Sequence, residues 1–250
     1  MDQPLLTFDH VVGVTQDHIM DEDFPVSFEL LPGEIGIFTS GHKSSSLARL
    51  AALRGIITGG SITILGTTVR AEDDPARYLS LNFTKSFIHH VGFCHHSGGL
   101  LANMSILQNV MLPAHYHGDD PHAGPFLEIA RARLGELGVP EEHWNLRPSD
   151  VPREIQKLAL LARSIATNPR ILILDEPTEH IPWAKIRDIL AWVLEQKKKG
   201  TGVLIATSND PFALHLGDWM IDLDANEGIY DKNGIHRSLG GNAGMSSKLF

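Results

Sequence analysis

Two adjacent carboxylates, Asp175 and Glu176, follow directly on the apolar run Ile171–Leu174. Four apolar residues that lead into acids predict a buried parallel strand whose carboxyl end delivers side chains to a site. There the first carboxylate can hold a magnesium ion through water, and the second can polarise an attacking water molecule. Packing and hydrogen bonding at a strand end would also account for both acids. The pair therefore predicts a candidate catalytic centre at Asp175 and Glu176.

A second candidate is the polar segment between the short buried strand Ile35–Phe38 and a helix that we expect from Leu47. We expect a polar loop from Thr39 to Ser46, and it contains the residue types that bind phosphate. Glycines let backbone amides turn toward phosphate oxygens, a lysine neutralises them, and a hydroxyl ligates magnesium. The nucleotide-binding candidates here are Gly41, Lys43, Ser44 and Ser45. The alternative is a serine-rich helix entry in which a hydroxyl caps free amides.

Histidines form a rival signal, with fourteen in the chain, including the pair His89–His90 and the run Cys94–His96. Cysteine and histidine are good ligands for zinc or copper. Adjacent residues on a strand point to opposite faces, so at most two or three of these side chains could converge. No Cys-x-x-Cys or His-x-x-x-His spacing supports them. We therefore predict no metal site, and keep a metal-binding regulator as a minor hypothesis.

The amino-acid composition excludes several classes of protein. The 250 residues, 42% hydrophobic, can bury the core of one large domain or of a domain with a lobe. A net charge of −9 argues against a nucleic-acid partner, because only the short run Lys197–Lys199 is strongly basic. The single cysteine excludes an internal disulfide, and the N-terminus lacks a secretion signal. No apolar segment approaches the ~20 residues that span a bilayer. We expect a cytosolic protein that reaches a membrane through a partner.

Strands and helices alternate along the chain. The segments Leu5–Val14 and Phe24–Leu31 alternate apolar and polar residues as half-buried antiparallel strands do. Later, the apolar runs Ile171–Leu174 and Val203–Ala206 predict two parallel strands joined by an amphipathic helix. The sequence predicts a single α/β domain over 1–250, with an antiparallel N-terminal part and helices on both faces of a mainly parallel sheet. Its core would comprise 1–112 and 148–250, and residues from about 113 to 147 would form a helical lobe.

Several segments resemble, in order and spacing, the ATP-binding cassette (ABC) subunits of membrane transporters, over nearly the whole chain. They are Pro32–Ile35, Gly60–Ile64, Ala162–Ala166, Asn168–Pro169 and Ile173–Thr178. The resemblance implies the P-loop NTPase-like nucleotide-binding fold, ATP and Mg²⁺ as ligands, a transmembrane permease as partner, and pairing of two cassettes. Within the family, His96–Pro113 looks most like subunits that drive phospholipid traffic with an MCE-type lipid-binding partner.

The resemblance gives Asp175 and Glu176 the roles of the Walker B carboxylates and shows where other motifs are altered. Between Gly33 and Leu47 the chain is two residues shorter than the family pattern. Either Lys43 survives in a contracted loop, or Ser44 takes the lysine position. The glutamine that senses magnesium becomes His96, and the histidine that contacts the terminal phosphate becomes Ser208.

Two further family features are altered. The aromatic that stacks on adenine is replaced by one of the residues Val12–Val14. The signature segment, whose amides grip the terminal phosphate of the opposing subunit, aligns with Val151, Pro152, Arg153, Glu154 and Ile155. Pro152 has no amide hydrogen to offer, and Glu154 places an anion where an anion should dock. This segment also fits a simple helix start capped by Asp150 or Ser149.

Two main hypotheses follow. In the first, a degenerate cassette binds ATP and Mg²⁺ weakly, hydrolyses little, and acts by docking on a permease and pairing with itself or with a competent ATPase. In the second, an active ATPase uses Lys43, Asp175 and Glu176 in a contracted site. Under either, Leu100, Leu101 and Met104 would face the permease, and the chain would lie peripherally on the inner face of the cell membrane.

Overall fold

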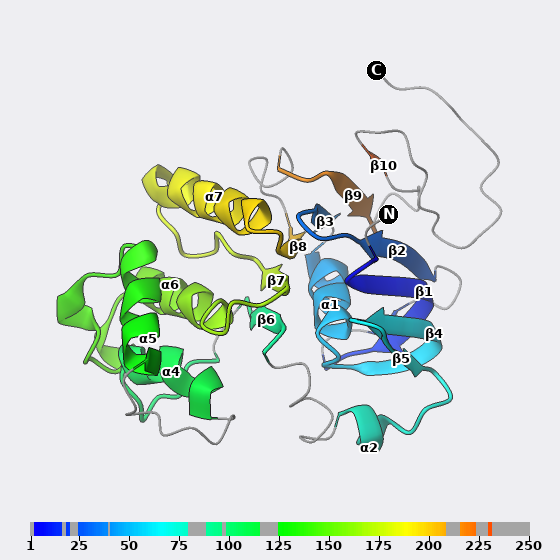
Figure 1. Ribbon diagram of the computed structural model, residues 1–250, viewed down its shortest axis with the longest axis horizontal. Helices are drawn as coiled ribbons and strands as arrows, with labels where there is room; N and C mark the ends of the chain where they lie inside the picture. Colours follow the sequence, from blue (N-terminus) through cyan, green and yellow to red (C-terminus); the bar gives the residue numbers. More distant parts are fainter. Residues whose placement is uncertain are drawn as a thin grey trace.

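The computed structural model of the chain describes residues 3–16, 19–20, 25–39, 41–79, 89–96, 99–115, 125–208, 216–223 and 230–231. These residues form two β-sheets with helices packed around them, and the predicted α/β fold is confirmed (Figure 1). None of the helices in the described ranges has both the length and the apolarity that crossing a membrane requires.

The larger sheet has six strands, in the order β10-β9-β3-β8-β7-β6. All neighbours pair in parallel except β10 with β9. The strands are β3 (Ile35–Thr39), β6 (Val91–Cys94), β7 (Ile171–Asp175), β8 (Gly202–Thr207), β9 (Trp219–Asp222) and β10 (Tyr230–Asp231). The predicted parallel pair of strands is confirmed as β7 and β8. Carboxyl ends of parallel strands meet at one edge of a sheet, so β3, β6, β7 and β8 all deliver residues to the same edge.

The smaller sheet is antiparallel, in the order β2-β1-β4-β5. Its strands are β1 (Leu6–Val14), β2 (Val26–Leu30), β4 (Ile56–Ile64) and β5 (Thr67–Arg70). The predicted N-terminal antiparallel pair is confirmed, with Leu6 opposite Leu30, although Phe24 lies outside the described residues. Along β2 the buried residues alternate with less buried ones, as expected for a sheet packed on one face.

The two faces of the six-stranded sheet support separate cores. Helix α1 (Gly41–Ala51) packs with Leu47 and Leu50 between the two sheets, against Phe38 and Ile173. On the opposite face, residues such as Leu172 join a second core with the helices α6 (Arg153–Ser164) and α7 (Trp183–Lys198). Since successive residues of a strand point to opposite faces, the uninterrupted apolar run of β7 serves both cores.

A helical group lies on the side of the molecule away from the antiparallel sheet (Figure 1). It consists of α4 (Ile106–His115), α5 (Pro125–Glu136) and α6, with the short turns η1 (Glu141–His143) and η2 (Pro148–Asp150); a separate short helix, α2 (Pro75–Tyr78), follows β5. Helix α4 begins before Pro113, where the sequence predicted the helical part to start. Ser105 and Gln108 account for this, because each side chain accepts from the other's backbone amide in a capping box. The division into a core of 1–112 and 148–250 and a lobe of 113–147 stays a prediction.

Gly36 lies in β3, the strand that precedes the segment that could bind phosphate, and it has a packing role there. A Cβ added there would lie 2.2 Å from the Trp219 ring, which is itself 1% exposed and makes tilted ring contacts with Phe28 and Phe38. Real side chains do not approach so closely, so the ring or the strand would have to move.

We therefore predict that Gly36→Ala lowers the free energy of unfolding by roughly 1–3 kcal/mol, the usual cost of overpacking a core. Gly135→Ala is the matched control, because a Cβ at this helical position meets nothing within 4 Å. Helix propensity should make the control neutral or slightly stabilising. Urea denaturation followed by circular dichroism measures both variants, and equal stabilities would contradict the packing role.

Candidate functional site

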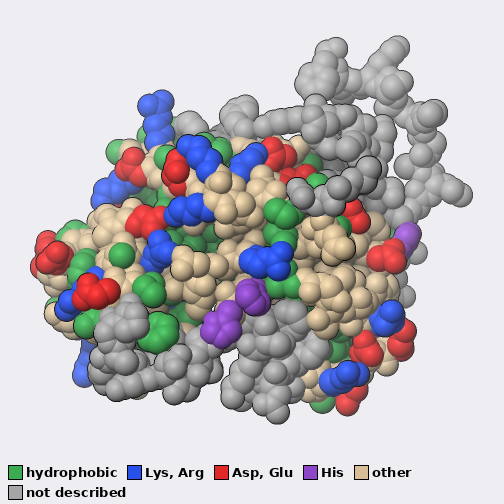
Figure 2. Space-filling model, in the orientation of Figure 1, with side chains coloured by type: hydrophobic (Ala, Val, Ile, Leu, Met, Phe, Trp, Pro, Cys, Tyr) green, Lys and Arg blue, Asp and Glu red, His purple; other side chains and the backbone are tan. Residues whose placement is uncertain are grey.

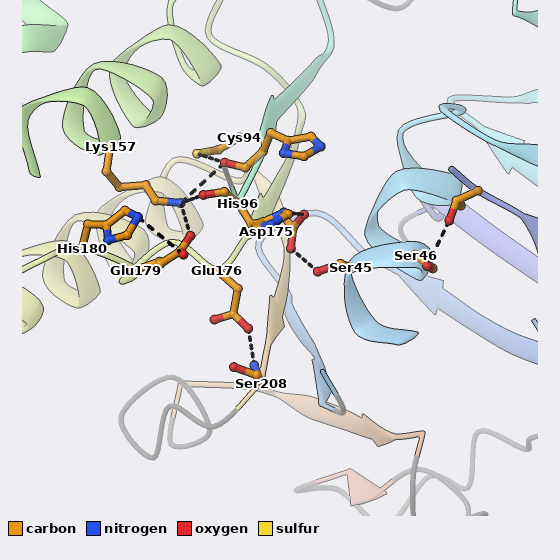
Figure 3. Close-up of polar contacts among 12 residues, drawn as sticks. Ser45, Ser46, Cys94, His96, Lys157, Asp175, Glu176, Glu179, His180 and Ser208 are labelled. Carbon is orange, nitrogen blue, oxygen red and sulfur yellow. Dashed lines mark hydrogen bonds and ion pairs between the residues drawn. The ribbon is translucent and has the colours of Figure 1, made fainter. Parts of the chain in front are cut away.

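The centre of the candidate site is Asp175, the last residue of β7, whose side chain is fully buried. Ser45 Oγ donates a hydrogen bond to Asp175 Oδ1 at 2.6 Å, and His96 Nδ1 lies 3.4 Å from Asp175 Oδ2. Helix α1, strand β7 and the segment after β6 thus meet at one carboxylate (Figure 3). The structure brings together three residues that the sequence singled out: Asp175, Ser45 and His96.

Helix α1 begins almost directly after β3. The strand ends at Thr39 and the helix starts at Gly41, so the predicted polar loop over Thr39–Ser46 is wrong. The serines lie in the first two turns of the helix, where Ser44 and Ser46 are buried and Ser46 Oγ is 3.0 Å from Thr15 Oγ1. Small hydroxyl side chains fit between two sheets because each can satisfy its polar atom nearby.

Lys43 lies in the first turn of α1, and its ammonium group donates a hydrogen bond to the Leu223 carbonyl at 3.2 Å. That carbonyl directly follows strand β9. Ser45, two residues further along the helix, is the residue that contacts Asp175. In nucleotide hydrolases a hydroxyl from the phosphate loop and the Walker B aspartate hold magnesium together. The contact therefore favours the alignment in which Ser44, and not Lys43, occupies the lysine position.

Glu176 has a left-handed backbone, with φ of 47°, and its side chain turns toward the end of β8 (Figure 3). One of its carboxylate oxygens accepts a short hydrogen bond from the Ser208 backbone amide. The other lies 3.3 Å from Thr207 Oγ1, which donates to it. The structure thus brings Glu176 and Ser208 together, but through the amide of Ser208. A φ of this sign is uncommon for a residue other than glycine.

The segment aligned with the signature motif is a plain helix start. Pro152 occupies the N-cap of α6 and makes no side-chain capping hydrogen bond, while Glu154 forms an ion pair with Lys185 at 2.6 Å. Arg153 is the first helical residue, and Val151 and Ile155 are buried. Capping by Asp150 or Ser149 is therefore a wrong prediction. Both residues belong to the short turn η2, where Ser149 Oγ donates to Asp150 Oδ1 at 3.1 Å.

The predicted permease-facing residues lie on the segment that leads into α4. Leu101 is 45% exposed, whereas Leu100 and Met104 are half-buried. Asn109, fully buried in α4, fixes this segment: its side chain accepts from the Leu101 amide at 2.7 Å and donates toward the Leu101 and Met104 carbonyls. Sequence reasoning missed Asn109, although a lone amide on the apolar face of a helix is a signal for such a role.

Lys157 is a second residue that the sequence analysis missed. It is only 2% exposed, its ammonium donates to the His96 carbonyl at 2.8 Å, and Glu179 lies 3.9 Å away (Figure 3). A cleft opens beside it, lined by residues of α6 and its neighbours. These residues are His96, Leu100, Pro148, Arg153, Gln156, Lys157, Leu160 and His180. A charge within the otherwise apolar stripe of α6 could have revealed Lys157, because such residues are rarely buried without partners.

Cys94, the last residue of β6, is fully buried, and its Sγ lies 3.8 Å from the His95 carbonyl. Burial raises the pKa of this thiol to about 11, because the thiolate would lose its hydration. The side chain is therefore a protonated packing group at neutral pH. It offers neither a nucleophile nor a thiolate ligand to the neighbouring histidines.

With this geometry in view, comparison with known proteins identifies the class. The family model described as "ABC transporter" matches residues 25–179, so the chain belongs to the ABC transporter family. Two similar relatives are lipoprotein-releasing system ATP-binding proteins. The protein from Zymomonas mobilis is 32% identical over 67% of this chain and 68% of its own length. The protein from Novosphingobium aromaticivorans is 29% identical over 82% of this chain and 87% of its own length.

Solved structures show the same fold. The dimeric structure of MJ0796, a bacterial ABC transporter cassette, superposes with a TM-score of 0.74 at 21% identity, covering 87% of this chain and 94% of that one. Another dimeric structure of the cassette MJ0796, in a post-hydrolysis state bound to ADP and Pi, gives a TM-score of 0.75 at 19% identity, with the same coverage. The two-sheet arrangement with a helical group is therefore the ABC nucleotide-binding fold.

Proposed function

We propose that the chain is the nucleotide-binding subunit of a transporter of lipid-linked cargo, and that it binds ATP and Mg²⁺ weakly and hydrolyses little ATP. The observation that carries this proposal is the junction of β3 and α1. One residue separates the end of β3 at Thr39 from the start of α1 at Gly41. A phosphate-binding loop needs several residues there, since its backbone amides must surround the phosphates before the helix begins. The free amides of a helix start remain, and they bind an anion less completely.

The charges around the junction support the same conclusion. Lys43 donates to the Leu223 carbonyl, and the lysine position of the motif is taken by the buried Ser44.

The resemblance places the adenine platform at Val12–Val14, where Val12 is buried in the core. Loss of base stacking on an aromatic costs about 1–3 kcal/mol, and so roughly ten- to hundredfold in affinity.

The segment aligned with the signature motif, which we call the clamp because in this family it grips the terminal phosphate bound by the opposing subunit, is also altered. This change affects how two copies could pair around a nucleotide. In the aligned segment Pro152 lacks an amide hydrogen, and Glu154 already pairs with Lys185. An acid in this place repels a phosphate. A homodimer would therefore combine altered loops with altered clamps at both nucleotide sites, whereas in a heterodimer with a complete ATPase each site would have one complete half. We favour such a heterodimer, in which this chain has a regulatory or scaffolding role.

The alternative is an active ATPase, and one observation favours it. Asp175, Ser45 and His96 meet at the position where magnesium is held in this family. Asp175 and Ser45 offer the oxygen donors that magnesium prefers, and the ion would neutralise charge on the phosphates. Glu176 would then have to leave Ser208 and Thr207, from which it accepts hydrogen bonds, before it could polarise water.

The partner in this proposal is a transmembrane permease on the inner face of the membrane, with the chain bound peripherally from the cytoplasm. The names of the lipoprotein-releasing relatives support a lipid-linked cargo, and phospholipid transport with an MCE-type partner is a narrower form of the proposal. Leu101 supplies exposed apolar area, and Asn109 holds it in place for a permease helix. Acidic and basic side chains are interspersed on the face shown in Figure 2, a pattern that offers little attraction to a nucleic acid.

The affinity for ATP tests whether the short connection between β3 and α1 can bind phosphate. We expect ATP with Mg²⁺ to bind with a Kd of about 100 μM or weaker in calorimetric titration. Lys43→Ala should change this value less than about twofold, because the ammonium group is bound to a carbonyl outside the phosphate position. Lys198→Ala, an exposed lysine on α7, is the matched control. Low-micromolar affinity that Lys43→Ala destroys would establish the active alternative.

Substitution of Glu176 tests the clamp. In a working cassette Glu176→Gln traps nucleotide in a closed dimer, because binding persists while chemistry stops. Here we expect the variant to elute from size-exclusion chromatography as the same species with and without ATP and Mg²⁺. Glu195→Gln, an exposed acid on α7, is the control. A nucleotide-dependent shift to dimer in the Glu176 variant alone would mean that the clamp functions.

The permease surface can be tested with one charge. Leu101→Glu should abolish co-purification with a permease encoded beside this chain, because a carboxylate would have to be buried against an apolar helix. Leu79→Glu places the same charge at a leucine of similar exposure, 42% against 45%, on the antiparallel side of the molecule. Loss of co-purification in both variants, or in neither, would contradict the assignment of Leu101.

A further inference from the structure

We propose that His95, His96 and Asp175 form a binding site for one divalent transition-metal ion of the zinc class. One ligand atom from each residue lies within 4.8 Å of the other two. The proposal does not rest on nucleotide binding, because all three ligands come from this chain. It also extends beyond the proposed transport function, which requires no such ion.

The two histidines converge because they lie beyond a strand. Strand β6 ends at Cys94, so the alternation of faces that would separate neighbouring side chains does not apply to His95 and His96. Their rings stack, with centroids 5.0 Å apart and an interplanar angle of 27°. The convergence of this pair lies within the limit of two or three side chains that the strand argument allowed, and the predicted absence of a metal site stays a prediction.

Asp175 supplies the independent evidence for a ligand. Its side chain is fully buried, and Oδ2 accepts no hydrogen bond from any described residue. A buried carboxylate oxygen without a donor is costly, and a bound cation would satisfy it. A ring nitrogen of His96, Nδ1, lies 3.4 Å from this oxygen. In a tetrahedral zinc site with ligands at about 2.0–2.1 Å from the ion, two ligand atoms lie about 3.4 Å apart. The distance between His96 Nδ1 and Asp175 Oδ2 therefore already matches that of two zinc ligands.

Neighbouring groups hold these ligands in place. Ser45 Oγ donates to Asp175 Oδ1 and so holds the carboxylate while leaving Oδ2 for another partner. Lys157 Nζ donates to the His96 carbonyl at 2.8 Å and lies 3.5 Å from that of His95, which fixes the backbone of both histidines (Figure 3). Outer partners of this kind orient the ligands of metal sites. The other distances between the ligand atoms of the three residues, which are up to 4.8 Å, would have to shorten when the ion binds.

The donor set decides which ion is preferred. Two imidazoles with one carboxylate suit Zn²⁺, Co²⁺ or Ni²⁺, and leave a fourth position for water. Mg²⁺ prefers an octahedral shell of oxygens and binds imidazole poorly. Since Asp175 is the residue expected to hold magnesium in this family, His95 and His96 change the metal preference of that position.

The test uses the full chain after treatment with a chelator and dialysis, without nucleotide. Co²⁺ is added and its visible absorption is recorded, and Zn²⁺ is then titrated in by calorimetry in competition. We expect one Co²⁺ per chain with a spectrum typical of four- or five-coordinate nitrogen and oxygen ligands, displaced by Zn²⁺ but not by a hundredfold excess of Mg²⁺.

Variants assign the ligands. His96→Gln and Asp175→Asn should each weaken Zn²⁺ binding by at least about 100-fold and change or abolish the Co²⁺ spectrum. The double variant His89→Ala/His90→Ala is the matched control, an adjacent histidine pair whose ring centroids are 6.3 Å apart, and it should bind as the unaltered chain does. Circular dichroism identifies variants that are unfolded. Should Asp175→Asn unfold, the partly exposed His96 carries the assignment.

Three results would overturn the proposal. One is Zn²⁺ affinity that persists in folded His96→Gln, another is affinity that is lost in the His89/His90 control, and the third is displacement of Co²⁺ by Mg²⁺. None depends on ATP affinity or turnover. A failure of the metal proposal is therefore distinguishable from a failure of the proposed transport function.

Discussion

The burial of the Asp175 carboxylate is the constraint on which the candidate site depends. A buried carboxylate needs hydrogen-bond donors or a cation beside it, because van der Waals packing alone does not offset the free energy of its lost hydration. Asp175 lies at the end of a strand that both cores require, so it cannot move toward solvent. Ser45 and His96 must therefore approach it, and this fixes α1 and the segment after β6 relative to the parallel sheet.

The same constraint accounts for the start of α1 so soon after β3. Ser45 can reach Asp175 only if the first turns of the helix lie close to the sheet edge, and the buried Ser44 and Ser46 allow that approach because they are small. A helix that starts at Gly41 leaves one residue for the connection from β3. The hydrogen bond from Ser45 to the buried carboxylate and the short connection from β3 thus both place the first turn of α1 at the sheet edge.

The parallel strands could be predicted from sequence because they are buried on both faces. When turn residues flank a short uninterrupted apolar run such as Ile171–Leu174, a buried strand is the element that its length and composition favour. The start of α1 could not be predicted, because serines ordinarily indicate a cap or a loop, and here tertiary partners such as Thr15 and Asp175 take their hydroxyl groups. The start of α4 was predictable, since Ser105 and Gln108 have capping-box spacing.

The candidate site likewise has residues that the sequence could place and residues that it could not. The acids Asp175 and Glu176 could be placed at a strand end from local pattern alone. The pairing of His95 with His96, and the support from Lys157, depend on where a strand stops and on which helix packs beside it. Lys157 and His96 are 61 positions apart, and no local periodicity encodes either contact.

Under the function that we propose, the phosphate loop is incomplete, and this changes how the charge of Asp175 is balanced. In a cassette that binds ATP tightly, magnesium arrives with the nucleotide and neutralises the buried carboxylate. A chain that rarely holds nucleotide leaves that negative charge uncompensated for most of the time. Histidines beside Asp175 offer a remedy, since imidazole can share with the carboxylate a metal ion that binds without nucleotide. The altered loop and the histidine pair can therefore be understood as parts of one adaptation.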